Sequence, residues 1–177
     1  MKKVLIALDY SETSELVAQH GYNLAKSMNA QVVLLHVISD PFIYNFSEFM
    51  PIMGFAGYAD TGLSMLKNEE VLKNISGDFL QHVKSFLNDP SISTYVKEGD
   101  FADEIVEFSK VINADLIVLG SHSHRWFEEI LLGSVTEKVL RNSNISLFIV
   151  PTKNMSIEKK KNRPPFEIKR VQRQTNP

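Results

Sequence analysis

The chain has 177 residues, 44% of them hydrophobic, and a formal net charge of −2 at pH 7. This length and apolar content suit one compact domain with a single substantial core. The sequence contains no cysteine, which excludes disulfides, thiolate metal sites and thiol catalysis and fits a reducing cytoplasm. It also has no run of eighteen apolar residues, so we expect no membrane span.

The charge is distributed unevenly along the chain. Residues 152–177 carry eight Lys/Arg and two Glu, whereas residues 1–151 carry 11 Lys/Arg and 19 Asp/Glu. An acidic body with a basic tail is not the charge pattern of a nucleic-acid-binding domain, so we expect no nucleic-acid partner. The tail lacks apolar periodicity, which favours an extended or disordered segment; contact with the acidic body is the alternative.

The first forty residues predict a strand–helix–strand unit. Residues 3–8 form a nearly continuous apolar run, which suits a strand buried on both faces. Residues 9–14 are rich in side chains that cap helices, and apolar residues then recur at helical spacing as far as Met28. Residues 31–38 predict a second buried strand. A unit of this length is typical of a right-handed parallel connection.

Residues 41–62 differ in composition from the rest of the chain. They include many aromatic and methionine residues, interrupted by Pro51, Gly54 and Gly57. This loop is too apolar to lie fully in water. Three interpretations stay open: it could fold over a crevice as a lid, pack on a partner subunit, or bury itself on its own domain.

Strands and helices keep alternating in the second half of the chain. Apolar residues from 72 to 86 recur with a helical period, which predicts a helix over 66–87. Ile92, Thr94 and Val96 alternate with polar residues, as in a third, less buried strand. The remaining predicted elements are a helix over 101–112, a strand over 115–120, a helix over 134–141 and a strand over 145–150.

This alternation predicts an α/β fold with a five-stranded parallel sheet and helices on both faces. If the strand order reverses between the first and fourth strands, a crevice opens above their carboxyl ends, and ligands bind at such reversals. Asp9, Tyr10 and Ser11 would reach the crevice from the first strand. The loop that begins at Gly120 would reach it from the fourth.

The loop after the fourth strand ends at Gly133-Ser134, where the next helix begins. The first N–H groups of a helix lack partners and its dipole favours negative charge, so this is a natural position for an anion. The alternative is that Gly120 and Gly133 are only turn residues. Because the loop coincides with the expected reversal of strand order, we favour a phosphate or nucleotide ligand.

Several segments of the chain are similar to the universal stress protein family. They are residues 4–14 (VLIALDYSETS), 34–38 (LLHVI), 98–100 (EGD), 114–122 (ADLIVLGSH) and 132–141 (LGSVTEKVLR), in the family's order. The resemblance implies a Rossmann-like (adenine nucleotide alpha hydrolase-like) fold with strand order 3-2-1-4-5. It also implies a family domain over residues 1–151, homodimers commonly formed through the last strand (145–150), and a cytoplasmic role in stress adaptation. The basic tail over 152–177 lies beyond the family's usual end.

Many members of this family bind ATP, and their marker is G-x2-G-x9-G-[S/T]. Gly120 and Gly133-Ser134 fit this marker, and Ser123 replaces its second glycine. The resemblance implies that ATP, with or without Mg²⁺, is the cofactor. By position it assigns the adenine and ribose contacts to Asp9 and Val37, and the ribose and phosphate contacts to Gly120, Gly133, Ser134 and Val135.

The loop residues His122, Ser123 and Arg125 complete the expected site. A serine in a left-handed backbone conformation costs about 1–2 kcal/mol, although its hydroxyl can itself donate to phosphate. His122 and Arg125 are interpreted as phosphate neighbours or solvated residues. His122 and His124 have no third ligand at metal-binding spacing, so we assign no metal site.

Two further residues have competing interpretations. Asp9 could be a Mg²⁺ ligand, a ribose acceptor or a helix cap, and we favour ribose contact together with capping. His36 lies inside an apolar strand and is interpreted as a hydrogen-bonded core histidine. Neither a Ser/His/Asp trio nor a G-x4-G-K-[S/T] loop is found, so no catalytic residue is assigned and at most a weak ATPase activity is expected.

The sequence therefore predicts a dimeric, nucleotide-binding regulatory module. The alternative hypothesis is an interaction module of the same fold that does not bind ATP and signals through dimerisation.

Overall fold

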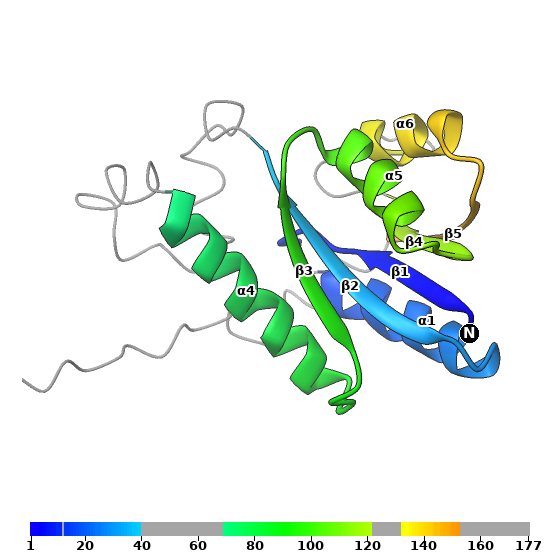
Figure 1. The fold of residues 1–177 in the computed structure, drawn as a ribbon, viewed down its shortest axis with the longest axis horizontal. Coiled ribbons are helices and arrows are strands. Elements are labelled where there is room, and N and C mark those ends of the chain that lie inside the picture. Colours follow the sequence, from blue (N-terminus) through cyan, green and yellow to red (C-terminus); the bar gives the residue numbers. More distant parts are fainter. Residues whose placement is uncertain (12, 40–68, 122–131, 153–177) are drawn as a thin grey trace, which may run out of the picture.

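The computed structural model describes residues 1–11, 13–39, 69–121 and 132–152, and it contains alternating strands and helices (Figure 1). The elements are β1 (Lys3–Ala7), α1 (Ser14–Ser27), β2 (Gln31–Ile38), α4 (Glu69–Phe86), β3 (Ser93–Glu98), α5 (Phe101–Val111), β4 (Leu116–Gly120), α6 (Ser134–Asn142) and β5 (Ser146–Val150). Our predictions for loop 41–62, for His122, Ser123 and Arg125, and for the tail beyond Thr152 fall outside the described residues.

The five strands form one parallel sheet in the order β3-β2-β1-β4-β5. This order confirms the predicted fold. From β1 the chain crosses first to β2 and β3 on one side, and then to β4 and β5 on the other. The strand order therefore reverses between β1 and β4, which pair in register from Val4↔Leu116 to Ile6↔Val118.

Helices cover both faces of the sheet, which explains why its central strands are continuously apolar. Successive side chains of a strand point to opposite faces. Val4 and Ile6 of β1 thus pack into the core beneath α1 and α4, whereas Leu5 packs into the core beneath α5 and α6. Figure 1 shows the two helix pairs on opposite sides of the sheet. Gly21 lets α1 lie close to β1, because a Cβ there would stand 2.7 Å from the Cδ1 atom of Ile6.

The sequence located the elements to within a few residues. β3 is the less buried strand, as its alternating pattern predicted, because it lies at an edge of the sheet. It begins one residue later than expected, since the N–H of Ile92 bonds to the carbonyl of Asp89 in the preceding turn. None of the helices in the described ranges is long and apolar enough to cross a membrane.

Candidate functional site

The candidate site lies where the strand order reverses. β1 and β4 are parallel neighbours, so the residues that follow them emerge at the same end of the sheet, on either side of the reversal. Asp9 follows β1, and Gly120 is the last residue of β4. The prediction that these two segments lie side by side is confirmed.

The two ends of the G-x2-G-x9-G-[S/T] marker, at Gly120 and Gly133, are joined by hydrogen bonds, although residues 122–131 between them are not described. The N–H of Gly133 donates to the carbonyl of Ser121 at 2.7 Å, and the Thr136 hydroxyl donates to the carbonyl of Gly120 at 2.9 Å. Ser121 is tied in turn to the end of β5, because its N–H donates to the Val150 carbonyl at 2.8 Å. The first turn of α6 is therefore fixed directly against the end of β4.

Sequence reasoning missed Thr136 and Ser121 as parts of this arrangement. Both side chains are buried, and the Ser121 hydroxyl also accepts from the N–H of Thr152 at 3.0 Å. The only signal in the sequence is that each hydroxyl residue follows a motif glycine closely, Ser121 directly and Thr136 three residues after Gly133. The pattern cannot tell which hydroxyls turn inward.

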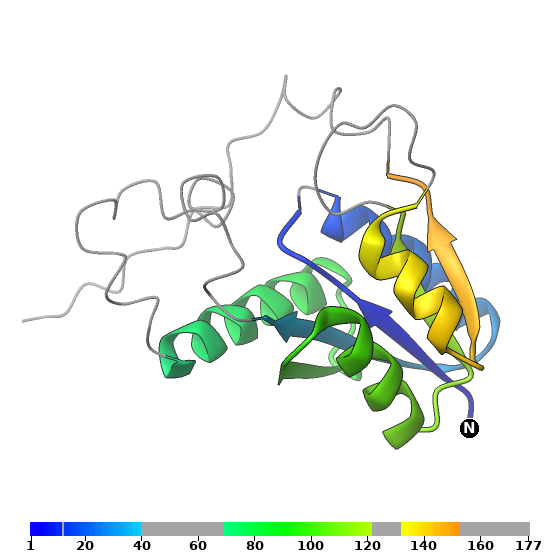
Figure 2. The same ribbon diagram turned by 90° about the horizontal axis from the view of Figure 1, so that it is seen from above.

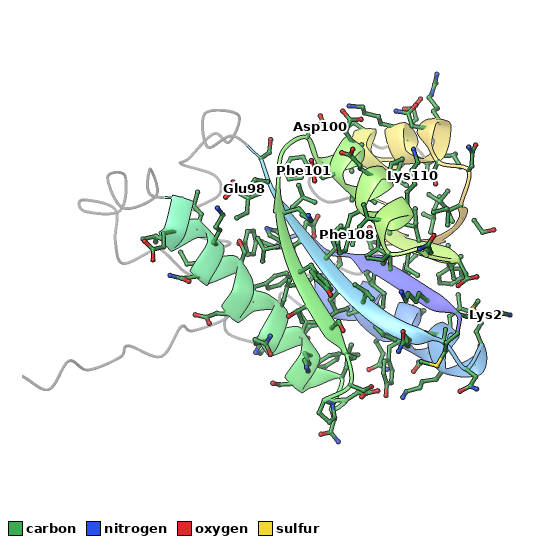
Figure 3. All side chains as sticks on the ribbon, in the orientation of Figure 1. Lys2, Glu98, Asp100, Phe101, Phe108 and Lys110 are labelled. Carbon is green, nitrogen blue, oxygen red and sulfur yellow. The ribbon has the colours of Figure 1, made fainter. Side chains whose placement is uncertain are left out.

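The helices that begin at this end of the sheet differ in how their first turns are capped. Asp100 caps α5 by accepting from the N–H groups of Ala102 at 3.0 Å and Asp103 at 3.1 Å. Figure 3 shows Asp100 and Phe101 at the start of that helix. The N-cap residues of α1 and α6, Thr13 and Gly133, make no such side-chain bond.

The first turn of α6 consequently offers backbone donors. Within the described part of the chain, no acceptor is found for the N–H groups of Ser134 and Val135. These are two of the residues expected to hold phosphates. Figure 2 shows α6 (yellow) beginning at the end of the sheet toward which the β1 arrow (blue) points, and β4 runs parallel to β1. Because the helix dipole adds to the donors, this turn favours an anion.

Asp9 does not cap a helix, so that part of our prediction is wrong. Its Oδ1 accepts from the N–H of Ser11 at 3.0 Å in a local turn, whereas α1 begins only at Ser14. An aspartate serves equally well in such a turn or as an N-cap, and the start of the helix decides between them. Among the described residues no donor reaches the second oxygen, Oδ2, which leaves it available to a ligand hydroxyl.

Tyr10 and Val37, also expected in the site, contribute mainly to packing. The Tyr10 hydroxyl bonds to Ser76 Oγ of α4 at 2.7 Å, and its ring centroid lies 4.2 Å from that of His36. The Val37 side chain is buried in the core beneath α5. Val37 lies two residues beyond Leu35, which is the last residue of β2 that pairs with β1. Because the Val37 side chain is buried, a contact with a ligand would have to be through its backbone.

His36 is the hydrogen-bonded core histidine that the sequence predicted. It is 4% exposed, and its Nδ1 donates to the carbonyl of Leu8 at 2.8 Å. Burial lowers the pKa of His36, so the ring is neutral at pH 7 and carries its proton on Nδ1.

Comparison with known proteins places the chain in a family. The family model described as the universal stress protein family matches residues 1–151. The chain belongs to the universal stress protein family. It is 33% identical over 159 residues to the universal stress protein MJ0577 of Methanocaldococcus jannaschii. This alignment covers 86% of our chain and 96% of the relative. The resemblance that the motifs indicated is thereby confirmed.

Solved structures of the family share the fold. The structure of MJ0577 aligns with a TM-score of 0.64 and 32% identity over 86% of this chain and 97% of the other. A universal stress protein in complex with cAMP aligns with a TM-score of 0.55 and 21% identity, over 84% of this chain and 96% of the other. The universal stress protein from Archaeoglobus fulgidus in complex with dAMP aligns with a TM-score of 0.53 and 15% identity, over 84% of this chain and 97% of the other.

Proposed function

We propose that this chain is a regulatory module in stress adaptation that binds an adenine nucleotide, ATP alone or with Mg²⁺, at the carboxyl ends of β1 and β4. The observation that carries the proposal is the uncapped first turn of α6, held against the end of β4 by the Gly133–Ser121 and Thr136–Gly120 hydrogen bonds. Two family members of the same fold were solved with cAMP and dAMP, which supports the ligand class.

Each part of a nucleotide has a matching group in the proposed site. The N–H groups of Ser134 and Val135 are suited to the phosphates, because they add hydrogen bonds to the favourable helix dipole. The Oδ2 atom of Asp9 is suited to a sugar hydroxyl, which is a donor. The base would then lie toward the end of β2, near the Val37 backbone.

The proposed module is a homodimer formed through strand 145–150, with a cytoplasmic location. β5 is the outer strand of the sheet beside β4, so one edge of its backbone has no neighbouring strand within the described residues. Leu147, Phe148 and Ile149 are each only half-buried there. A partly exposed apolar edge strand favours pairing with a second copy. Nucleotide occupancy would bias how the dimer engages its partners.

The ligand is tested first by mass spectrometry of the purified, denatured protein, since an occupied site retains its nucleotide, and then by calorimetric titration with ATP. An adenine nucleotide is the expected result. If neither measurement finds nucleotide binding at millimolar concentration, the proposal is wrong and the interaction module without ATP is favoured.

The position of the site is tested by Gly133→Asp. Gly133 has φ −67° and ψ 153°, close to the φ −69° and ψ 130° of Asp100, so an aspartate there would cap α6 in the way that Asp100 caps α5. The free energy of unfolding should stay constant or rise by about 0.3 kcal/mol, because Asp is a slightly better N-cap than Gly. ATP affinity should fall by at least about tenfold, since the carboxylate occupies the phosphate position.

Gly133→Ala is the matched control, because alanine adds neither a cap nor a charge at the same position. It should retain most of the affinity. Unchanged ATP affinity in Gly133→Asp would place the ligand elsewhere on the molecule.

A further inference from the structure

The turn that carries Asp9 is braced by two neighbouring elements. On its amino-terminal side, the carbonyl of Leu8 accepts from Nδ1 of His36 on β2 at 2.8 Å. On its carboxyl-terminal side, the Tyr10 ring packs against the rings of His36 and of Phe79 on α4, with centroid distances of 4.2 and 5.0 Å, and those two rings also contact each other at 5.6 Å. Both neighbours of Asp9 in the chain are thus held by side chains distant in sequence.

The Tyr10 hydroxyl adds a directed bond to this packing. It lies 2.7 Å from Ser76 Oγ, and Ser76 donates its own proton to the carbonyl of Leu72 at 2.7 Å. A serine hydroxyl has one proton, so Tyr10 must be the donor in the bond to Ser76. Burial raises the pKa of Tyr10 to about 12, and the hydroxyl therefore keeps its proton at physiological pH.

Asp9 itself is fixed by the turn that these contacts hold. Its Oδ1 accepts from the N–H of Ser11, the residue that follows Tyr10, so the orientation of the carboxylate depends on the path of the backbone through Tyr10. If Tyr10 shifts, Ser11 shifts with it, and Oδ2 no longer points in a fixed direction. The cost of orienting a binding group is lower when the surrounding structure has already fixed it.

We propose that Tyr10 is the positioning residue of the site: its hydrogen bond to Ser76 on α4 fixes the turn so that Asp9 presents Oδ2 to the sugar hydroxyls of the bound nucleotide. This inference rests on the proposed function. It assigns Tyr10 a role through Asp9 in place of a direct ligand contact. It also makes α4 part of the support of the site, through the bond between Tyr10 and Ser76.

The first test compares matched hydroxyl deletions. Tyr10→Phe and Ser76→Ala should each weaken ATP binding by about three- to tenfold, the usual net effect of one hydrogen bond. The double variant should bind as the weaker single variant does, because both changes remove the same bond. Tyr22→Phe and Ser85→Ala are the controls: Tyr22 donates to Asp89 far from the site, and Ser85 bonds back to Gln81 on the same helix α4.

A nucleotide without sugar hydroxyls separates positioning from a general loss of structure. Tyr10→Phe should bind 2′,3′-dideoxy-ATP as well as the wild-type chain does, because the contact with Asp9 is already missing from that ligand. An equal loss for ATP and for the dideoxy nucleotide would overturn the proposal, and so would wild-type affinity for both.

The second test needs no ligand and separates this inference from the proposed function. Exchange of the Ser11 amide proton, measured by NMR, reports the bond from Ser11 to Asp9. It should be at least about threefold faster in Tyr10→Phe than in Tyr22→Phe. If the wild-type chain binds no nucleotide but Ser11 exchange still accelerates, the proposed function fails and the bracing of Asp9 stands. Unchanged exchange in Tyr10→Phe overturns the bracing whatever the ligand.

Discussion

The bond between Thr136 and Gly120 allows a sharp test of how the candidate site is built. The Thr136 hydroxyl of α6 donates to the last carbonyl of β4 at 2.9 Å, and the threonine side chain is only 4% exposed. Thr136→Val keeps the shape of the side chain and removes only the donor. The Gly120 carbonyl, at a partly buried residue, would then lose this partner.

The expected cost follows from that geometry. An intramolecular hydrogen bond stabilises a fold by about 1 kcal/mol net, and an acceptor left buried without a partner costs about 1–3 kcal/mol. With a urea dependence of about 2 kcal/mol per molar for a domain of this size, a loss of about 2 kcal/mol moves the unfolding midpoint down by about 1 M. Because the same bond holds the first turn of α6 against β4, ATP affinity should fall as well.

Urea unfolding followed by circular dichroism measures the shift, and two variants act as controls. Thr136→Ser keeps the hydroxyl and should lose less than about half as much stability. Thr94→Val removes a hydroxyl on the edge strand β3, where Thr94 accepts only from an exposed glutamine, and should be nearly neutral. If Thr136→Val unfolds at the same urea concentration as the wild type, the bond does not hold α6 in place and our account of the site is wrong.

Two further predictions concern the acid stability and the assembly of the chain. Hydrogen bonds from Lys26 and then from Ser91 hold the pKa of Asp89 well below its usual range. The ionised carboxylate therefore stabilises the fold above about pH 4, the pKa of an aspartate in the unfolded chain. This stabilisation is lost as the pH falls through the lower pKa of the folded state. Asp89→Asn should therefore be less stable than the wild type at neutral pH, and urea unfolding should show this difference shrinking on acidification; a difference independent of pH would contradict the assignment. Ile149→Lys on the edge of β5 should convert the expected dimer to a monomer in light scattering, whereas Val111→Lys, at an exposed position on α5, should not; a dimer that survives Ile149→Lys would exclude this edge as the interface.

The sequence was sufficient for the elements of the fold because their signals are local. The apolar run from Val4 to Ile6 requires burial on both faces, and only a strand inside a layered sheet provides it. The alternation around Val96 marks an edge strand in the same way. Strand order followed from the family resemblance, since local patterns do not specify which strands become neighbours.

The contacts that build the site could not be predicted, because their partners are distant in the chain. Tyr10 and Ser76 are 66 residues apart, and Ser121 and Thr152 are 31 apart. A hydroxyl residue looks the same in sequence whether it points into a core or into water. Asp9 shows the same limit at short range, because its neighbours permit both a helix cap and a local turn, and only the start of α1 decides between them.

The contrast between α5 and α6 explains why the proposed function depends so strongly on the single position Gly133. The two helices pack against each other and begin at the same end of the sheet with nearly the same N-cap backbone angles. In α5 the Asp100 carboxylate occupies the anion position, and the N–H of Asp103 and then the Lys138 ammonium hold the pKa of Asp100 below its usual value. That helix end is already satisfied by a negative charge of its own. In α6 the N-cap is Gly133, which has no side-chain acceptor. The first N–H groups and the positive dipole end of α6 would therefore still favour an anion that does not come from the N-cap side chain. The backbone would accept an aspartate at either position, and the glycine at 133 leaves the first turn of α6 without the acidic cap that α5 has.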